Sequence, residues 1–327
     1  MGRFPECRFA KVFALTFVLA GAVVAQNKPD SAAVKDHIEK AKKLAGKEWA
    51  KQEDFFCNNP IPNRANDPLI EPVKLFDNFW ALGSISTTIY AITTTEGIVL
   101  IDAGYPDQMN TVLLPQLKKA GLDESKIKYV FLGHGHVDHY GAAKYLQEKY
   151  GTKVAAAGPD WDLMVPPPNS GKQARDDAPR RDMVLTDGQT VKIGDFQMQV
   201  VTIPGHTEGS VSYIFPVKEG KKTYVAGLYG GTVLVPRIAW NLDEYQRSLL
   251  KWADAAKKAN VTVQLQNHPH MLDFPSKLDQ LQSRKAGAPN PFVVTNEAYG
   301  RYFHMIQECT AAQNQRMVDN PPANAAR

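Results

Sequence analysis

Three of the eight histidines in this 327-residue chain fall within six residues, in the run His134-Gly135-His136-Val137-Asp138-His139. From the composition, a chance match to H-x-H-x-D-H is expected on the order of once in several thousand chains. Imidazole nitrogens with a carboxylate oxygen form a donor set suited to Zn²⁺. Alternate residues of an extended segment point the same way, so His134 and His136 can bind one metal. Asp138 and His139 then turn toward a second. The pattern predicts a metal site rather than a solvated histidine-rich loop.

Two further histidines directly follow apolar, strand-like segments. His206 lies in Pro204-Gly205-His206-Thr207, and His268 lies in Asn267-His268-Pro269. Taken alone, each is more typical of a structural histidine, but beside an H-x-H-x-D-H cluster both become candidate ligands. His270 competes with His268 for this role. We favour His268 because it is nearest the strand end and because Pro269 stiffens the chain that follows.

Strand and helix patterns alternate along the chain and lead into these candidate ligands. Strands are predicted at Ile85–Thr93, Ile98–Ile101, Tyr129–Leu132, Thr190–Ile193, Phe196–Ile203, Val211–Phe215, Thr223–Ala226 and Val261–Gln266. Helices are predicted at Ser31–Ala50, Met109–Ala120, Tyr140–Tyr150, Asp243–Ala259, Pro275–Ala286 and Thr295–Cys309. Each half supplies strands and then helices, which predicts two packed β-sheets with helices outside.

Two segments have the composition of irregular structure. Asn58–Pro72 is rich in proline and asparagine, and Pro159–Asp187 contains three consecutive prolines and several charges. The second segment is too long for a plain connector. It is either a lid or wall of a substrate site, or a disordered insertion.

The N-terminus has the pattern of an export signal. Arg3, Arg8 and Lys11 precede the apolar run Val12–Val24, which is too short to span a bilayer comfortably. We expect cleavage before Gln26, and hence a periplasmic or secreted protein with no stable membrane anchor. The alternative is a buried first helix. The expected organisation is a signal peptide (1–25), an N-terminal helix and loop extension (26–72), one hydrolase domain (73–315) and a flexible tail (316–327).

Cysteine content and net charge exclude one kind of metal site and one class of partner. Cys7 leaves with the signal, and Cys57 and Cys309 then form one disulfide or remain as two thiols. Two cysteines cannot make a cysteine-rich zinc site. The net charge is +4, without a basic run that would favour nucleic acid. The expected partner is therefore a small-molecule substrate, while the oligomeric state stays open.

The motifs together resemble those of the metallo-β-lactamase superfamily. Gly97–Gly104, the histidine cluster, Pro204–Gly209 and the late His268 occur in that family's order. The resemblance extends roughly from Val73 to Phe274. It implies an α+β fold, a four-layer αββα sandwich, with metals at one edge between the sheets.

One missing residue indicates which subclass of the superfamily the chain resembles. Most members carry a metal-bridging Asp at the end of a strand between the third and last ligand histidines, whereas Tyr224–Tyr229 ends without a carboxylate. Asp243 and Glu244 come much later, at a helix start. The remaining donor set is similar to that of subclass B3 metallo-β-lactamases. The resemblance implies two Zn²⁺ per chain, the first bound by His134, His136 and His206, and the second by Asp138, His139 and His268.

Three further positions concern substrate binding or support of the metal loops. Subclass B3 enzymes commonly have a small polar residue near Gly227, which holds a water or the substrate carboxylate. Gly227 has no side chain to do so. Tyr229 either offers a substrate-binding hydroxyl in its place or is a packing tyrosine. Asp102 is expected to support the metal loops rather than contact substrate.

The resemblance implies metal-assisted hydrolysis, in which zinc lowers the pKa of bound water to about 7. Asp138 would then orient the resulting hydroxide as the catalytic residue, and no G-x-S-x-G nucleophile motif is present. The leading hypothesis is a subclass B3-like β-lactamase that opens the β-lactam amide with zinc-bound hydroxide and confers antibiotic resistance. A second is a hydrolase of the same fold that acts on lactones, esters or another small substrate. A third is a non-catalytic metal-binding protein.

Overall fold

The computed structural model describes residues 29–58, 67–168, 170–173, 175, 177–231 and 239–321. The expected export signal, residues 1–25, lies outside these residues, and so do residues 322–327 of the expected C-terminal tail. Among the described helices, none combines the length and the apolar character needed to cross a bilayer.

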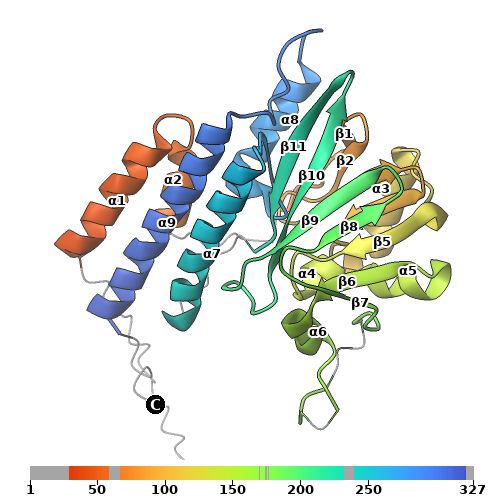
Figure 1. Cartoon of the computed structure of the whole chain (residues 1–327), viewed down its shortest axis with the longest axis horizontal. Helices are drawn as coiled ribbons and strands as arrows, with labels where there is room; N and C mark the ends of the chain where they lie inside the picture. The colour runs from red at the N-terminus through yellow and green to blue at the C-terminus, as the bar shows by residue number, and fades with distance from the viewer. Residues whose placement is uncertain are drawn as a thin grey trace, which may run out of the picture.

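Two β-sheets pack face to face (Figure 1). The seven-stranded sheet has the order β1 to β7, and its strands are β1 (Val73–Phe76), β2 (Phe79–Gly83), β3 (Thr88–Thr94), β4 (Gly97–Ile101), β5 (Ile127–Phe131), β6 (Lys153–Ala157) and β7 (Met183–Leu185). The five-stranded sheet has the order β12-β11-β10-β9-β8, made of β8 (Thr190–Ile193), β9 (Phe196–Thr202), β10 (Val211–Glu219), β11 (Lys222–Tyr229) and β12 (Val263–Gln266). Strands β4 to β7 run parallel, as do β11 and β12.

An apolar core fills the space between the sheets. Strands β8 and β9 alternate buried and exposed residues, as expected when one face of a sheet packs on a core and the other meets solvent. Aromatic side chains from both sheets meet there: Phe79 stacks on Tyr90 and also contacts Phe215, while Phe131 meets Tyr213 edge to face. This shared core fixes one sheet relative to the other.

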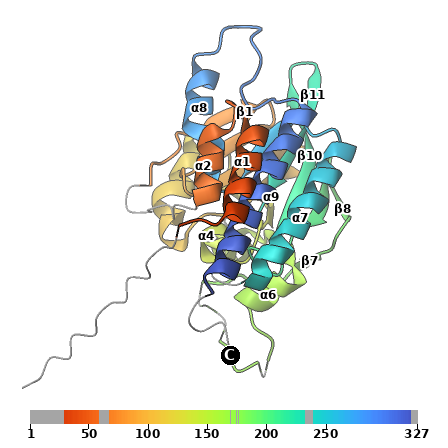
Figure 2. The same ribbon diagram turned by 90° about the vertical axis from the view of Figure 1, so that its left-hand side faces the viewer.

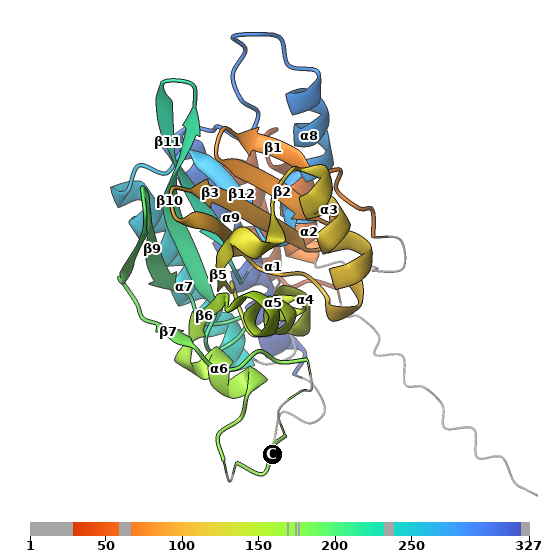
Figure 3. The same ribbon diagram turned by 90° about the vertical axis from the view of Figure 1, so that its right-hand side faces the viewer.

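Helices cover both outer faces of the sandwich. On the seven-stranded sheet lie α3 (Leu114–Lys119), α4 (Val137–Tyr140), α5 (Ala143–Tyr150) and α6 (Gly158–Met164), as Figure 3 shows. On the five-stranded sheet lie α7 (Ala239–Lys258) and α9 (Asn296–Asp319), while α8 (Phe274–Gln282) borders the core between the sheets. The arrangement is the predicted four-layer αββα sandwich.

The N-terminal helices pack on the last helix of the chain (Figure 2). Ser31 caps α1 (Ala32–Ala45), and Gly46, at φ +56°, ends it, so the predicted helix over Ser31–Ala50 is two helices, α1 and α2 (Ala50–Asn58). A disulfide joins Cys57 in α2 to Cys309 in α9. The two cysteines are therefore paired, and residues 29–58 share a core with the five-stranded sheet and its helices.

Several elements differ from those predicted. The stretch Pro159–Asp187 is not wholly irregular, because it contains most of α6 and all of β7. Proline is favourable in the first turn of a helix, and the buried Trp161 fixes α6 by donating from its indole nitrogen to the Met183 carbonyl at 2.6 Å. Helix α9 continues to Asp319, so residues 316–319 are not a tail; Arg316 forms an ion pair with Asp30 at 2.8 Å.

Candidate metal centre

The candidate ligands follow the carboxyl ends of strands from both sheets. His134 comes three residues after β5, His206 follows β9, and His268 follows β12. Open sheets collect functional residues at this edge because parallel strands deliver their carboxyl ends to the same side. The packing of the two sheets therefore brings together loops that are more than 130 residues apart in the sequence.

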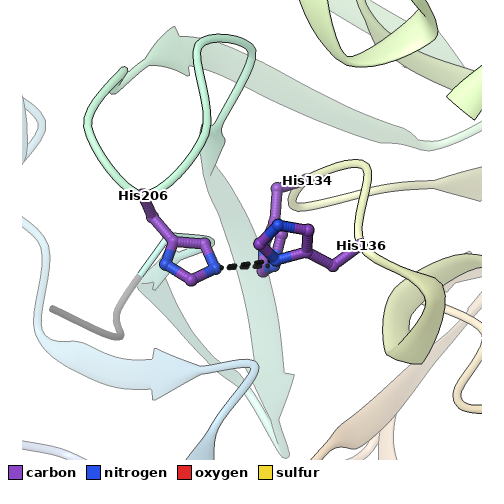
Figure 4. A group of neighbouring side chains, drawn as sticks. All are labelled: His134, His136 and His206. Carbon is purple, nitrogen blue, oxygen red and sulfur yellow. Dashed lines mark hydrogen bonds between the residues drawn. The ribbon is translucent and has the colours of Figure 1, made fainter. Parts of the chain in front are cut away.

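The first set of donors consists of His134, His136 and His206, whose rings face one another in Figure 4. His206 Nε2 lies 3.0 Å from His134 Nε2 and 3.1 Å from His136 Nδ1. In a tetrahedral zinc site with Zn–N bonds of about 2.0–2.1 Å, ligand nitrogens lie about 3.3–3.4 Å apart. The three nitrogens are thus close to the spacing of one zinc coordination sphere.

The second set lies directly beside the first. Asp138 Oδ2 is 3.3 Å from His139 Nε2 and 4.0 Å from His268 Nε2. Ligand atoms of His134, His139 and His268 also lie within 4.8 Å of one another. The structure therefore brings all six predicted side chains together. The side chain of His270, the alternative to His268, lies outside the described residues.

The donor chemistry fits a bound cation. His139 Nε2 is buried, and among the described residues it contacts Asp138 Oδ2 at 3.3 Å without forming a hydrogen bond. An unpaired buried nitrogen is costly unless another group satisfies it. A metal ion at the centre of the set would do so, and imidazole and carboxylate are ligands that zinc accepts.

Three of the rings are oriented by a contact on the side away from the donor set. His134 Nδ1 donates to the Gly230 carbonyl at 2.7 Å, and His268 Nδ1 donates to the Ser86 carbonyl at 2.6 Å. His139 Nδ1 meets Asp102 Oδ2 at 2.7 Å. A carbonyl oxygen only accepts, so the proton lies on Nδ1 and leaves Nε2 available as a ligand.

Asp102 supports the centre in the way predicted from the sequence. It directly follows β4, its side chain is fully buried, and its backbone has φ +62°. Besides holding His139, it accepts a hydrogen bond from the Gly133 backbone N–H at 2.7 Å. One carboxylate therefore fixes both the start of the His134 loop and a ring at its far end.

Three further supporting residues have no motif of their own. Asn267 donates to the Gly230 carbonyl at 2.7 Å, Thr87 donates to Asp138 Oδ2 at 3.3 Å, and Asp160 contacts two ligand loops. Of the three, only Asn267 could have been suggested by the sequence, because it is next to His268. The others come from elements distant in the chain.

The histidines of the centre differ in pKa because their charged neighbours differ. Burial and the neighbouring histidines lower the pKa of His134 well below its usual value, which keeps this ring neutral. Burial opposes charge on His139 too, but the carboxylates of Asp138 and Asp102 outweigh it and raise the pKa to about 10. Burial likewise opposes the charge on Asp138, yet His139 and His268 hold its pKa well below the usual range. A metal at His139 would displace the Nε2 proton.

The structure corrects the expectations for Gly227 and Tyr229. Tyr229 is fully buried among Tyr245, Trp252 and Phe303, on the helix side of the five-stranded sheet, so it packs rather than binds substrate. Gly227 faces the same helices, since a Cβ there would lie 2.5 Å from the Tyr299 hydroxyl. Strand β11 continues to Tyr229, so the position that faces the site lies further along the chain than Gly227.

That site-facing position is Gly230, whose carbonyl accepts from both His134 and Asn267. A Cβ at Gly230 would lie 2.0 Å from the Val211 carbonyl oxygen, and one at Gly231 would lie 2.9 Å from Ser210 Oγ. The approach to backbone at Gly230 leaves no room for a carboxylate side chain there, and one at Gly231 would require Ser210 to shift. The absence of a bridging Asp at this strand end is therefore built into the packing.

Comparison with known proteins places these features in a family. Residues 82–220 match the family model described as Metallo-beta-lactamase superfamily. BJP-1, a subclass B3 metallo-β-lactamase of Bradyrhizobium japonicum, is 25% identical with a TM-score of 0.61, over 80% of this chain and 94% of that one. A mutant of FEZ-1, the metallo-β-lactamase from Legionella gormanii, is 20% identical with a TM-score of 0.66, over 80% of this chain and 100% of that one, a likeness of fold.

The curated relatives carry a different name. A hydroxyacylglutathione hydrolase of Acidiphilium cryptum is 32% identical over 90 residues, 28% of this chain and 31% of that protein. One of Crocosphaera subtropica is 28% identical over 166 residues, 43% of this chain and 60% of that protein. The chain spans about a third of the length of the first curated relatives that it matches.

Proposed function

We propose that this chain, which carries a metallo-β-lactamase superfamily domain and has that fold, is a two-zinc hydrolase that opens β-lactams. The observation that supports this best is the donor set itself. Three histidines face one another on one side, and Asp138, His139 and His268 lie beside them. Gly230 leaves no space for a carboxylate side chain at the end of β11. This is the ligand pattern that the resemblance to subclass B3 enzymes implies.

Each supporting residue has a defined task in such a reaction. When bound, zinc acts as a Lewis acid and lowers the pKa of water to about 7. Asp138 stays anionic, and the Thr87 hydroxyl holds one of its oxygens at 3.3 Å. A fixed carboxylate at this place can accept a hydrogen bond from the attacking water and direct it toward a carbonyl carbon. Asp102 keeps His139 in the orientation that this geometry requires.

The sequence relatives favour a second candidate. Hydroxyacylglutathione hydrolases, by their name, cleave acyl esters of glutathione, and the chain matches them at about 30% identity over part of its length. A thioester or lactone carbonyl would be polarised by the same centre. The leader-like residues 1–25 favour export to the periplasm, which fits the subclass B3 enzymes that the chain resembles. We therefore place the β-lactam first.

A parallel turnover assay separates these candidates. The purified protein is tested on nitrocefin, on S-lactoylglutathione and on an acyl-homoserine lactone, with zinc and with a chelator. We expect nitrocefin turnover that a chelator removes and zinc restores. Turnover of the thioester or the lactone without β-lactam cleavage would reverse the order of the candidates. A zinc-loaded protein that is inert to all three would favour a non-catalytic role.

Metal content tests the centre itself. We expect about two zinc ions per chain, and about one after His206→Ala or after His268→Ala. His304→Ala, which removes an exposed histidine on α9, is the matched control and should keep two. Asp138→Ala should abolish turnover while circular dichroism and the unfolding transition stay those of a folded protein. Wild-type turnover in that variant would remove Asp138 from the mechanism.

A further inference from the structure

Asp160, in the first turn of α6, is a buried carboxylate outside the six-residue donor set. Only 1% of the residue is exposed. Its Oδ2 accepts from the Gly135 backbone N–H at 2.7 Å and from the Thr207 hydroxyl at 2.8 Å. Its Oδ1 accepts from the Gly209 backbone N–H at 3.0 Å. Three donors therefore converge on one side chain that itself contacts no ligand ring.

These donors belong to the two loops that carry the first set. Gly135 is the spacer between His134 and His136, and Thr207 directly follows His206. One loop follows β5 of the seven-stranded sheet, while the other joins β9 to β10 of the five-stranded sheet. Asp160 thus links the two ligand loops across the boundary between the sheets.

Two glycines give an independent indication of the same link. A Cβ at Gly135 would lie 3.0 Å from the Asp160 carbonyl oxygen and 3.1 Å from its Cβ. A Cβ at Gly209 would lie 2.5 Å from the Asp160 backbone nitrogen. Neither glycine has the positive φ that would by itself require glycine. A side chain at Gly209 would force Asp160 to shift and one at Gly135 would be tightly crowded by it, which accounts for glycine as the spacer within the histidine cluster.

We propose that Asp160 is a positioning residue that holds the His134–His136 loop and the His206 loop together, and so sets the metal affinity of the first donor set but not of the second. His206 Nε2 lies 3.0 Å from His134 Nε2 and 3.1 Å from His136 Nδ1, so the first set is formed across the two loops that Asp160 joins. Asp102 serves the second set in the corresponding way, through His139. Each half of the centre has its own buried carboxylate.

The inference rests on the proposed two-metal centre, so its test isolates each half. In a His268→Ala background the first set is the complete one, and in a His206→Ala background the second set is. Zinc affinity is measured by competition with a chromophoric chelator, before and after Asp160→Ala. We expect binding to weaken about 10–100-fold in the first background, the range seen for residues that orient ligands, and to stay unchanged in the second. Asp162→Ala, on the same helix but exposed and paired with Arg181, should change neither.

Equal weakening in both backgrounds would show a general structural role and overturn the proposal, as would no change in either. A wild-type protein that binds no zinc would instead refute the proposed function. Asp160→Asn keeps the test informative if the alanine variant fails to fold. The amide oxygen still accepts from one loop, but its NH₂ group faces another donor at Gly209. We expect an intermediate loss of affinity, again confined to the first set.

Discussion

Replacing Asp102 should destabilise the fold and weaken zinc binding by the second donor set. Its carboxylate is fully buried, lies 2.7 Å from His139 Nδ1 and accepts the Gly133 N–H at 2.7 Å. Alanine would leave that N–H without its buried partner, at about 1–3 kcal/mol, and would remove a charge-assisted bond worth about 1.5–3 kcal/mol. Alanine also tolerates φ +62° less well, which adds about 1 kcal/mol.

The expected loss of unfolding free energy is therefore about 3.5–7 kcal/mol for Asp102→Ala. Asparagine adopts positive φ readily, and its oxygen can still accept the Gly133 N–H, so Asp102→Asn should lose only about 1–3 kcal/mol. Both variants should bind zinc about 10–100-fold more weakly in a His206→Ala background, where the second set is the complete one.

Urea denaturation of the metal-free proteins gives the first quantity, and chelator competition gives the second. Asp36→Ala, an exposed carboxylate on α1, is the control and should change stability by no more than about 0.5 kcal/mol. Equal stabilities of the Asp102 variants and the control would refute the hydrogen-bond argument. An unchanged zinc affinity would refute the positioning role, even if stability fell.

Three further predictions concern regions away from the centre. Replacing Cys57 and Cys309 together with serine should lower the unfolding free energy by about 2–5 kcal/mol, because the disulfide closes a loop with a sequence separation of 252. Denaturation without reductant measures this loss. The zinc content of the variant should stay at about two ions per chain. Gly227→Ser should destabilise by about 1–3 kcal/mol, since its Cβ would lie 2.5 Å from the Tyr299 hydroxyl, and a stable variant with altered substrate preference would contradict the packing role. Burial lowers the pKa of Lys277, so its charge destabilises the fold at neutral pH and this penalty disappears as the pH rises toward 10.5. The stability of Lys277→Met relative to the wild type should therefore fall as the pH rises from 7 toward 10.5; a relative stability that rises with pH would disprove the sign.

The donor set could be predicted from the sequence because its information is local. His134, His136, Asp138 and His139 lie in one run, and His206 and His268 each follow an apolar strand by a few residues. The carboxyl ends of the packed strands lie along one edge and present their side chains there. Strand pattern and residue type together were therefore sufficient to predict the ligands. The supporting residues could not be found this way.

Asp160 shows why those residues were missed. Its partners are 25 and 47 residues away along the chain, and their contact depends on how α6 sits against both sheets. Strand β6, which leads into α6, reads Lys-Val-Ala-Ala-Ala, and alanine has weak strand propensity. With β6 unrecognised, the helix after it was assigned to an irregular stretch, and its carboxylate had no predicted position.

The error at Gly227 has a different origin. The local pattern predicted a strand only over Thr223–Ala226, and the family resemblance extended it to Tyr229, where β11 ends in pairing with Gln266 of β12. Side chains alternate between faces along a strand, so the position of its end decides which residue meets the site and which meets the helices. Local pattern does not fix that end, because it depends on pairing with β12, which is distant in sequence.

Reciprocal contacts between the sheets explain how distant ligands arrive at the right spacing. Tyr213, on β10 of the five-stranded sheet, donates to the Leu132 carbonyl after β5 at 2.6 Å. Tyr90, on β3 of the seven-stranded sheet, donates to the Gln266 carbonyl at the end of β12 at 2.8 Å. Burial raises the pKa of both hydroxyls, so they remain neutral donors.

Each tyrosine thus holds a ligand-bearing strand end of the opposite sheet, two residues before His134 in one case and two before His268 in the other. The metal centre and the core between the sheets are therefore one cooperative unit. Separation of the sheets would pull His206 and His268 away from the early cluster, so the donor sets exist only in the packed sandwich. Because metal binds the assembled donors far better than the unfolded chain, the free energy of zinc binding adds to the stability of the sheet packing itself.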